Sequence, residues 1–198
     1  MGFFNWAAPM FNKVSNRWSP DTISEIAGWL DPFMNGDGST RHVLDVGGGT
    51  GALAARLNAE TGVRVTVLDP TPEMLAYLPR NDDITGVLGV AEKMPFAADT
   101  FDAVIVTDAF HHFRDQDAAA REFQRVVRCD GGVIVVELDP SVWFMRLIVA
   151  AEKALGEPGA FFTPEEMCAF FAGHGIDGTC ERLKGPSYRF TGAVRRQG

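Results

Sequence analysis

The chain has 198 residues, of which 46% are hydrophobic and 22% are charged, and its formal net charge is −8. This length suits one globular domain, and the hydrophobic fraction is too high for a disordered chain. The acidic balance argues against a partner with a phosphate backbone, so we expect no nucleic-acid binding. Three cysteines, Cys129, Cys168 and Cys180, are too few for a disulfide framework or a zinc ribbon, and we expect no metal.

Targeting and membrane signals are weak in this sequence. The longest apolar stretch, residues 142–151, is interrupted by Arg146 and has half the ~20 residues that a membrane span needs. The first residues lack the basic start and the continuous apolar core of a signal peptide. We therefore expect a cytoplasmic protein without a membrane span, either a monomer or a homodimer.

From residue 42 onward, apolar runs typical of strands alternate with amphipathic runs typical of helices. The expected strands are residues 42–46, 63–68, 84–89, 101–106, 133–138, 176–183 and 188–194. The expected helices are residues 50–60, 70–78 and 115–128, with a fourth that a capping box opens at Thr163 and that extends to Phe171. This alternation predicts an α/β fold with a seven-stranded, mostly parallel sheet and helices on both faces.

The connection between the last two predicted strands, residues 184–187, is too short for a crossover. A link of this length forms a hairpin, so the last strand is predicted to run antiparallel to its neighbour.

A glycine-rich sequence, DVGGGTG, covers residues 45–51 at the end of the first predicted strand. Glycines allow a sharp turn and a close approach of a ligand to the backbone. The pattern Gly47-x-Gly49-x-x-Ala52 also satisfies the loose dinucleotide fingerprint, which leaves a nicotinamide-dependent oxidoreductase as an alternative. Asp45 argues against that alternative, because a carboxylate suits a cationic ammonium group better than a pyrophosphate. No Gly-Lys-Ser/Thr follows, so a P-loop is excluded.

Asp69 ends the second predicted strand, close to the ~20-residue spacing expected of an acid that accepts hydrogen bonds from ribose hydroxyls. The alternative is an exposed carboxylate that caps the helix after it.

Five segments then occur in order between residues 42 and 139: DVGGGTG, VTVLDPTPEML, AEKMPF, DTFDAVIV and AREFQRVVRCDGGVIVVELDP. With these segments the chain resembles the class I S-adenosylmethionine (SAM)-dependent methyltransferases. It is similar to their small-molecule branch, which includes the ubiquinone/menaquinone C-methyltransferases. The resemblance implies a Rossmann-like seven-stranded sheet whose last strand is antiparallel, SAM as the cofactor and a small-molecule methyl acceptor.

The resemblance also implies roles for single residues. The methionine part of SAM would lie against Asp45, Gly47, Gly49, Thr50, Gly51 and Thr107, with Asp45 near its amino group. The ribose and adenine would lie against Asp69, Pro70, Met74, Val90, Ala91 and Glu92, with both ribose hydroxyls on Asp69. Two of these residues have ordinary alternatives, Glu92 as a solvated side chain and Met74 as part of the core.

The acceptor side of the site is predicted at the carboxyl ends of the strands, where open α/β sheets bind ligands. His111 and His112 follow the fourth predicted strand, and Glu137 and Asp139 end the fifth. A phenol or carbon acid needs a base, and histidine titrates near neutrality, so His111 and His112 are the candidate bases. The alternative is that one of them docks or caps the next helix. The quinone-type enzymes typically have Arg-Asn at this place, which argues against a quinone acceptor.

We expect one methyltransferase domain over residues 1–198. It would comprise an N-terminal helical lid (1–35), a SAM-binding core (36–140), an insertion with a helix (141–175) and a C-terminal hairpin (176–198). Residues 1–35 and the insertion are rich in aromatic and large apolar residues, and we interpret both segments as a roof over a small, largely apolar or aromatic acceptor. Ordinary core packing is the alternative for these side chains. The alternative to an enzyme is a SAM-binding partner subunit without turnover.

Overall fold

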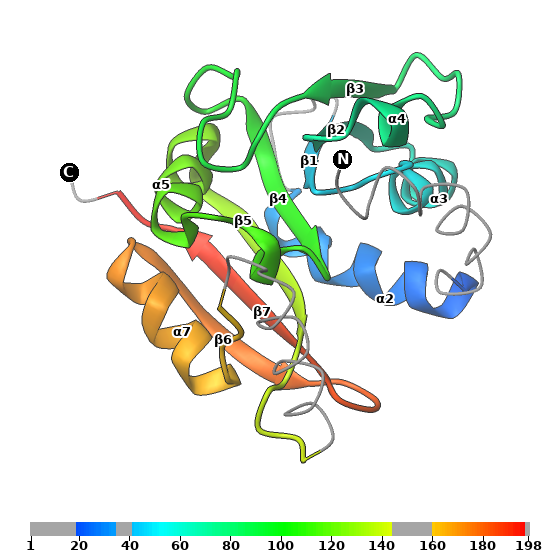
Figure 1. Ribbon diagram of the computed structural model, residues 1–198. Coiled ribbons are helices and arrows are strands. Elements are labelled where there is room, and N and C mark those ends of the chain that lie inside the picture. Colours follow the sequence, from blue (N-terminus) through cyan, green and yellow to red (C-terminus); the bar gives the residue numbers. More distant parts are fainter. Residues whose placement is uncertain (1–18, 35–40, 144–159, 197–198) are drawn as a thin grey trace.

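The computed structural model describes residues 19–34, 41–143 and 160–196 (Figure 1). Within these ranges one sheet contains β1 (His42–Val46), β2 (Arg64–Asp69), β3 (Ile84–Leu88), β4 (Phe101–Thr107), β5 (Val127–Leu138), β6 (Ile176–Arg182) and β7 (Ser187–Val194). The strand order is β3-β2-β1-β4-β5-β7-β6. Neighbours from β3 to β5 are parallel, whereas β7 runs antiparallel to both β5 and β6. The predicted Rossmann-like sheet with an antiparallel last strand is confirmed.

Helices cover both faces of this sheet (Figure 1). On one face lie α2 (Pro20–Leu30) and α3 (Ala52–Thr61), and on the other lie α5 (Gln116–Val126) and α7 (Pro164–Gly173). The residues beneath α2 and α3 form the first core, and those beneath α5 and α7 form the second core. Successive residues of a strand point to opposite faces, so β1 contributes Val43 to the first core and Leu44 to the second. None of the described helices is long and apolar enough to cross a membrane.

The helix ends follow the signals in the sequence in three places. Gly62 ends α3 in the left-handed conformation, with a φ of 69°. Asp115 caps α5 by accepting from the Ala118 N–H at 2.8 Å. Thr163 and Glu166 form the predicted capping box of α7, with reciprocal bonds of 2.8 and 3.3 Å.

The helix predicted over residues 70–78 is shorter in the structure. Here α4 (Pro72–Leu75) is a single turn, and Thr71 occupies its N-cap without a side-chain hydrogen bond. The Leu78 side chain lies against Gly51 and Gly86, where neither glycine has a Cβ that would exclude it. The chain leaves the helix after Leu75 and turns, so that Leu78 fills this space. The apolar spacing that predicts a longer helix therefore reflects the packing of this turn.

The strand β5 begins at Val127 rather than at residue 133, and the predicted helix before it ends at Val126. Val127 pairs with Phe101, after which the pairing shifts and resumes between Gly132 and Ala103. The intervening residues form a bulge in which Asp130 has a φ of 62°. The polar and glycine residues of this bulge interrupt the apolar run, and for this reason the sequence pattern does not predict the first part of the strand.

The N-terminal residues that the structure describes pack on the sheet. Ile23, Ile26 and Leu30 of α2 are buried in the core. The Trp29 ring lies 4.4 Å from the Arg189 guanidinium of β7, and Phe33 lies against Gly132 at the start of the continuous part of β5. These two half-buried aromatic residues of the predicted lid therefore pack against strands of the sheet. The rest of the predicted roof, residues 1–18 and 144–159, lies outside the described residues.

Phe171 of α7 provides a test of how the second core is held together. It is fully buried, and its ring centroid lies 5.5 Å from that of Phe110, 6.4 Å from that of Phe123 and 4.6 Å from that of Phe190. We expect Phe171→Ala to lower the free energy of unfolding by about 3–5 kcal/mol, because the truncation removes these contacts and leaves a cavity. Urea unfolding followed by circular dichroism measures the loss, with the exposed Ala172→Ser on the same helix as control. A loss in Phe171→Ala no larger than that of the control would contradict this role.

Candidate cofactor and acceptor site

The turn between β1 and α3 depends on three glycines. Gly47, Gly49 and Gly51 have φ angles of 72°, 57° and 70°, a region that L side chains rarely adopt. A Cβ on Gly47 would lie 2.7 Å from the Ala109 Cβ, and one on Gly51 would clash with Leu78. A Cβ on Gly49 would meet no described atom within 4 Å. The backbone above Gly49 is therefore open to a ligand, while the other two glycines are also required by packing.

The N-terminus of α3 adds hydrogen-bond donors to this turn. Its N-cap is Gly51, which supplies no side-chain oxygen to the first N–H groups of the helix. The Gly51 N–H itself donates to the Gly48 carbonyl at 3.0 Å. Thr50, within this turn, is half-buried. An uncapped helix start attracts a negatively charged group such as a carboxylate.

Asp45 lies directly beneath the glycine turn. Its exposed fraction is 1%, and its carboxylate has no hydrogen-bond partner among the described residues. The carboxylate also occupies the space that a Cβ on Gly48 would need. Burial, together with the neighbouring Asp69, raises the pKa of Asp45 to about 7. Since a buried charge without a partner is costly, this group takes up either a proton or a cationic ligand near neutral pH.

Asp69 fastens the end of β2 to the glycine turn. One carboxylate oxygen accepts from the Gly49 N–H at 3.0 Å, and the other accepts from the Thr71 N–H at 2.8 Å. Burial raises the pKa of Asp69, and these two N–H donors offset part of the rise. The bond to Thr71 resembles the capping role considered from the sequence. A carboxylate has about four acceptor positions, so Asp69 retains capacity for two ligand hydroxyls.

The other residues assigned to the ribose and adenine follow the ends of β2 and β3. Pro70 is exposed, whereas Met74 of α4 is 6% exposed. Beyond β3, Val90 is 45% exposed and Ala91 is 4% exposed. All four belong to the segments next to Asp69, so the structure brings them to the same edge of the sheet as the glycine turn.

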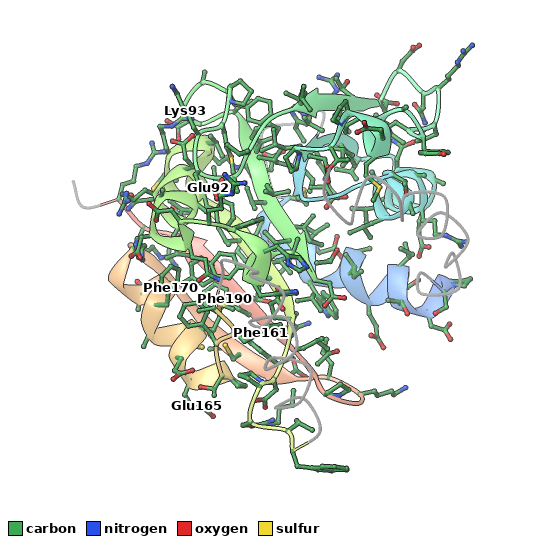
Figure 2. The ribbon with its side chains drawn as sticks, in the orientation of Figure 1. Glu92, Lys93, Phe161, Glu165, Phe170 and Phe190 are labelled. Carbon is green, nitrogen blue, oxygen red and sulfur yellow. The ribbon has the colours of Figure 1, made fainter. Side chains whose placement is uncertain are left out.

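Glu92 is half-buried and accepts hydrogen bonds from the start of the segment before α5. It lies in the loop between β3 and β4, next to Lys93 (Figure 2). One of its carboxylate oxygens accepts from the Arg114 N–H at 2.8 Å and from the Asp115 N–H at 3.4 Å. Glu92 therefore ties this loop to the start of α5, a contact between distant segments that the sequence does not reveal.

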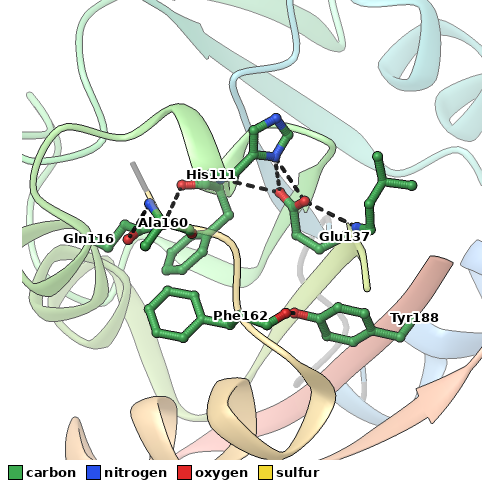
Figure 3. A network of polar contacts seen from close by, with 8 residues as sticks. His111, Gln116, Glu137, Ala160, Phe162 and Tyr188 are labelled. Atoms are coloured by element: carbon green, nitrogen blue, oxygen red, sulfur yellow. Dashed lines mark hydrogen bonds and ion pairs between the residues drawn. The ribbon is translucent and has the colours of Figure 1, made fainter. Parts of the chain in front are cut away.

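His111 lies in the short 3-10 helix η3 (Phe110–His112) that follows Thr107, the half-buried last residue of β4. Its exposed fraction is 6%, and its Nδ1 lies 2.8 and 3.0 Å from the two carboxylate oxygens of Glu137 (Figure 3). The partly buried His112 ring lies 4.0 Å from the His111 ring. The structure thus brings His111 next to Glu137, which the sequence marks only as a carboxylate at a strand end.

Asp139 is also buried, with an exposed fraction of 1%, but its surroundings differ from those of Asp45. Burial alone would raise its pKa, yet hydrogen bonds from the Ser141 hydroxyl (2.6 Å) and N–H (2.9 Å), with one from Arg182, hold the pKa below its usual range. These hydrogen bonds tie the Asp139 carboxylate to the ends of β5 and β6.

Two further features of the described residues lie outside this edge of the sheet. A depression of about 430 Å³, lined by Ala98, Gln124, Arg125 and Arg196, lies beside the start of β4, at the edge opposite the glycine turn. It contains none of the residues above, so we do not assign the cofactor to it. No group of three His, Cys, Asp or Glu residues within the described ranges is placed to hold a metal ion.

Comparison with known proteins agrees with this geometry. Residues 44–135 match the family model of a methyltransferase domain. An uncharacterized methyltransferase of Mycobacterium tuberculosis is 40% identical over 119 residues, which cover 58% of this chain and 45% of that protein. A ubiquinone/menaquinone biosynthesis C-methyltransferase of Rubrivivax gelatinosus is 32% identical over 108 residues, covering 54% of this chain and 43% of the relative.

Residues 44–135 of this chain are thus similar to a methyltransferase domain. The family resemblance predicted from the motifs is therefore confirmed. Human N-acetylserotonin methyltransferase, solved in complex with SAM, shares the fold with a TM-score of 0.75 at 18% identity, over 96% of this chain and 56% of that one. The aligned part spans less than half the length of the two curated relatives.

The raised pKa of Asp45 makes the stability of the ligand-free methyltransferase domain depend on pH. The pKa moves from 3.8 to about 7 on folding, so between these values the native state holds a proton that the unfolded chain has released. This contribution to stability is fully present below pH 4 and is lost as the pH rises through 7. We expect Asp45→Asn, which cannot ionise, to be more stable than the native chain at pH 8 by on the order of 1–3 kcal/mol.

Urea unfolding of both proteins at pH 5 and pH 8 measures this difference. Asp69 also has a raised pKa and acts in the same direction, so the comparison of the two proteins, rather than the slope of either one, isolates Asp45. Equal losses of stability in both proteins between the two pH values would contradict the assignment.

Proposed function

We propose that this chain binds SAM and transfers its methyl group to a small, largely apolar or aromatic acceptor. The observation that carries this proposal is the buried Asp45 beneath an open glycine turn, with Asp69 bonded to the same turn. The methyltransferase domain match and the fold shared with a SAM-bound enzyme support it.

The residues present fit SAM part by part. Its amino group is cationic and would neutralise Asp45, whose carboxylate has no other partner among the described residues. Its carboxylate suits the uncapped start of α3, and its ribose hydroxyls suit the remaining acceptor positions of Asp69. A nicotinamide cofactor would bring a pyrophosphate close to a buried carboxylate, and the like charges would repel each other. The same observations therefore favour SAM over a dinucleotide.

The mechanism that follows needs little covalent chemistry from the protein. SAM supplies a methyl group activated by a sulfonium. The glycine turn and Asp69 fix the position of the donor, and the turn after β4, in which Ala109 lies against Gly47, fixes the neighbouring wall. Holding donor and acceptor in reacting geometry and excluding water then supply much of the rate.

The acceptor class is inferred from the surroundings of the turn after β4. The half-buried rings of Phe161 and Phe162 lie beside it, and the Phe162 ring centroid lies 6.1 Å from that of the fully buried Phe110. Such a wall binds apolar and aromatic molecules by removing their surface from water, which is worth about 25 cal/mol per Å². The net charge of −8 provides no attraction for nucleic acid.

Calorimetry with SAM and with NAD, followed by methyl transfer from labelled SAM to a metabolite extract, tests the proposal. Binding of SAM together with labelled product supports it. Binding of SAM without any labelled product would indicate the alternative, a SAM-binding partner subunit. Binding of NAD in place of SAM would indicate an oxidoreductase.

Asp69→Ala tests the place of the ribose. The variant removes a charged acceptor from two hydroxyls, so we expect SAM binding to weaken by about 1.5–3 kcal/mol. Calorimetry measures the change, and Asp82→Ala, an exposed aspartate before β3, serves as the control. If Asp69→Ala binds SAM as tightly as the control, the ribose lies elsewhere.

Asp45 should release a proton when the cationic amino group of SAM arrives. Its pKa of about 7 means that roughly half of the ligand-free molecules are protonated there at pH 7. We expect the binding enthalpy of the native chain at pH 7 to differ between phosphate and Tris buffers, because the released proton is taken up by the buffer. The difference should be smaller in Asp45→Asn. An identical buffer dependence in both proteins would place the amino group away from Asp45.

A further inference from the structure

Two of the three cysteines lie side by side in the fold. Cys168 belongs to α7 and Cys180 to the edge strand β6, and their sulfur atoms are 2.7 Å apart. Both are free thiols, and both side chains are half-buried at the margin of the second core. The third cysteine, Cys129, is an exposed free thiol of β5.

Two stacked aromatic rings fix the spacing between α7 and β6 at this point. Phe171 lies one turn after Cys168 on the helix, and Phe190 pairs with Cys180 across β6 and β7. Side chains that face each other across an antiparallel pair share one face of the sheet, so Cys180 and Phe190 both face α7. The Phe171 and Phe190 rings are fully buried and stack with their centroids 4.6 Å apart. Their packing therefore holds the two sulfur atoms within reach of each other.

The connection between α7 and β6 also limits their relative movement. It is a tight turn in which the Gly175 N–H donates to the Ala172 carbonyl at 3.1 Å. Gly175 has a φ of 70°, and a Cβ at this position would lie 2.6 Å from Nε2 of Gln124. Both the turn and the stacked rings thus keep the helix in one place on the strand.

The distance between the sulfur atoms favours a covalent bond between them over a shared metal ion. Two thiolates on one tetrahedral zinc ion, each bonded at about 2.3 Å, stand more than about 3.5 Å apart. No group of three His, Cys, Asp or Glu residues in the described part of the chain could complete such a site. A disulfide places its sulfur atoms about 2.05 Å apart, which a small shift of either side chain would reach.

We propose that Cys168 and Cys180 form a modification site, at which exchange with a small cationic disulfide joins α7 to β6 by a disulfide. The Cys168 thiolate attacks one sulfur of the small disulfide and releases the other half as a thiol. The Cys180 sulfur then attacks the Cys168 sulfur and releases the second half. Two protein thiols are oxidised, one small disulfide is reduced to two thiols, and the two protein protons end on these thiols.

The surroundings of the pair set the order of attack and the class of reagent. Burial raises the pKa of Cys180, and Cys168 and Glu165 raise it further. Because the thiolate is the nucleophile, Cys168 makes the first attack and Cys180 the second. Glu165 is an exposed carboxylate on α7, three residues before Cys168 (Figure 2). Its negative charge favours the approach of a cationic disulfide over that of an anionic one.

The first test incubates the full-length Cys129→Ser chain with cystamine, which is cationic, or with oxidised glutathione, which is anionic. Mass spectrometry then follows unfolding and alkylation of the remaining thiols. We expect a chain that has lost the mass of two hydrogen atoms and takes up no alkyl group. Cystamine should react at least about threefold faster than glutathione, and Glu165→Gln should reduce this ratio.

Two outcomes of this experiment would count against the site. A small-molecule adduct that persists on Cys168 or Cys180 would show that the second attack does not occur, which overturns the proposal. Equal rates with cystamine and glutathione, unchanged in Glu165→Gln, would overturn the preference for a cationic reagent.

The second test asks whether the fold itself aligns the pair. We expect the disulfide of Cys129→Ser, equilibrated with reduced and oxidised glutathione, to form about 10–100-fold more favourably in the folded chain than in urea. By thermodynamic linkage the oxidised chain should then melt about 3–10 °C above the reduced chain. Cys168→Ser and Cys180→Ser cannot close the bond, so each should melt at one temperature under both conditions, with circular dichroism as the check of folding.

An equally favourable disulfide in the folded chain and in urea would overturn the proposal, and so would a lower melting temperature of the oxidised chain. Neither test involves SAM or methyl transfer, so this inference stands or falls separately from the proposed function.

Discussion

Asp45 stands on the central strand β1, between Val67 of β2 and Ile105 of β4, and neither neighbour offers a side-chain donor. Burial of this carboxylate raises the free energy of the folded state, and the burial of apolar side chains in the two cores on either side of the sheet compensates for it. A ligand that places a cation against this carboxylate removes part of the cost, so ligand binding and stability are linked through one group. The site is thus destabilising when empty and stabilising when filled.

The strand order explains why the other site residues converge on this point. From β1 the chain proceeds through β2 to β3 on one side, and from β4 to β5 on the other. The order reverses between β1 and β4, and open α/β sheets bind ligands at the carboxyl edge of such a reversal. The contact of Gly47 with Ala109 spans this reversal. Asp69 flanks it on one side and the His111–Glu137 pair on the other.

The sequence predicts well the features that depend on neighbours in the chain. The glycine turn, the strand β1, the capping box of α7 and the hairpin of β6 and β7 each follow from a short local pattern. The predicted start of β5 was wrong because a bulge interrupts the apolar pattern of the strand. The predicted length of α4 was wrong because the packing of Leu78 overrides the helical spacing. Pairings between distant residues, such as His111 with Glu137 or the contact of the Cys168 and Cys180 sulfur atoms at 2.7 Å, leave no trace in a single sequence.

The same side chains that stabilise the core beneath α5 and α7 also hold the turn after β4 in place. Phe110 is fully buried next to His111, and its ring contacts those of Phe162 and Phe171. Because Phe162 is also held through its carbonyl by Tyr188, the segment before α7 cannot shift without disturbing the packing of the helix. Packing fixes the orientation of a side chain more firmly than an exposed loop does. The orientation of the buried His111 ring is therefore fixed by the apolar cluster next to it and by the Glu137 carboxylate.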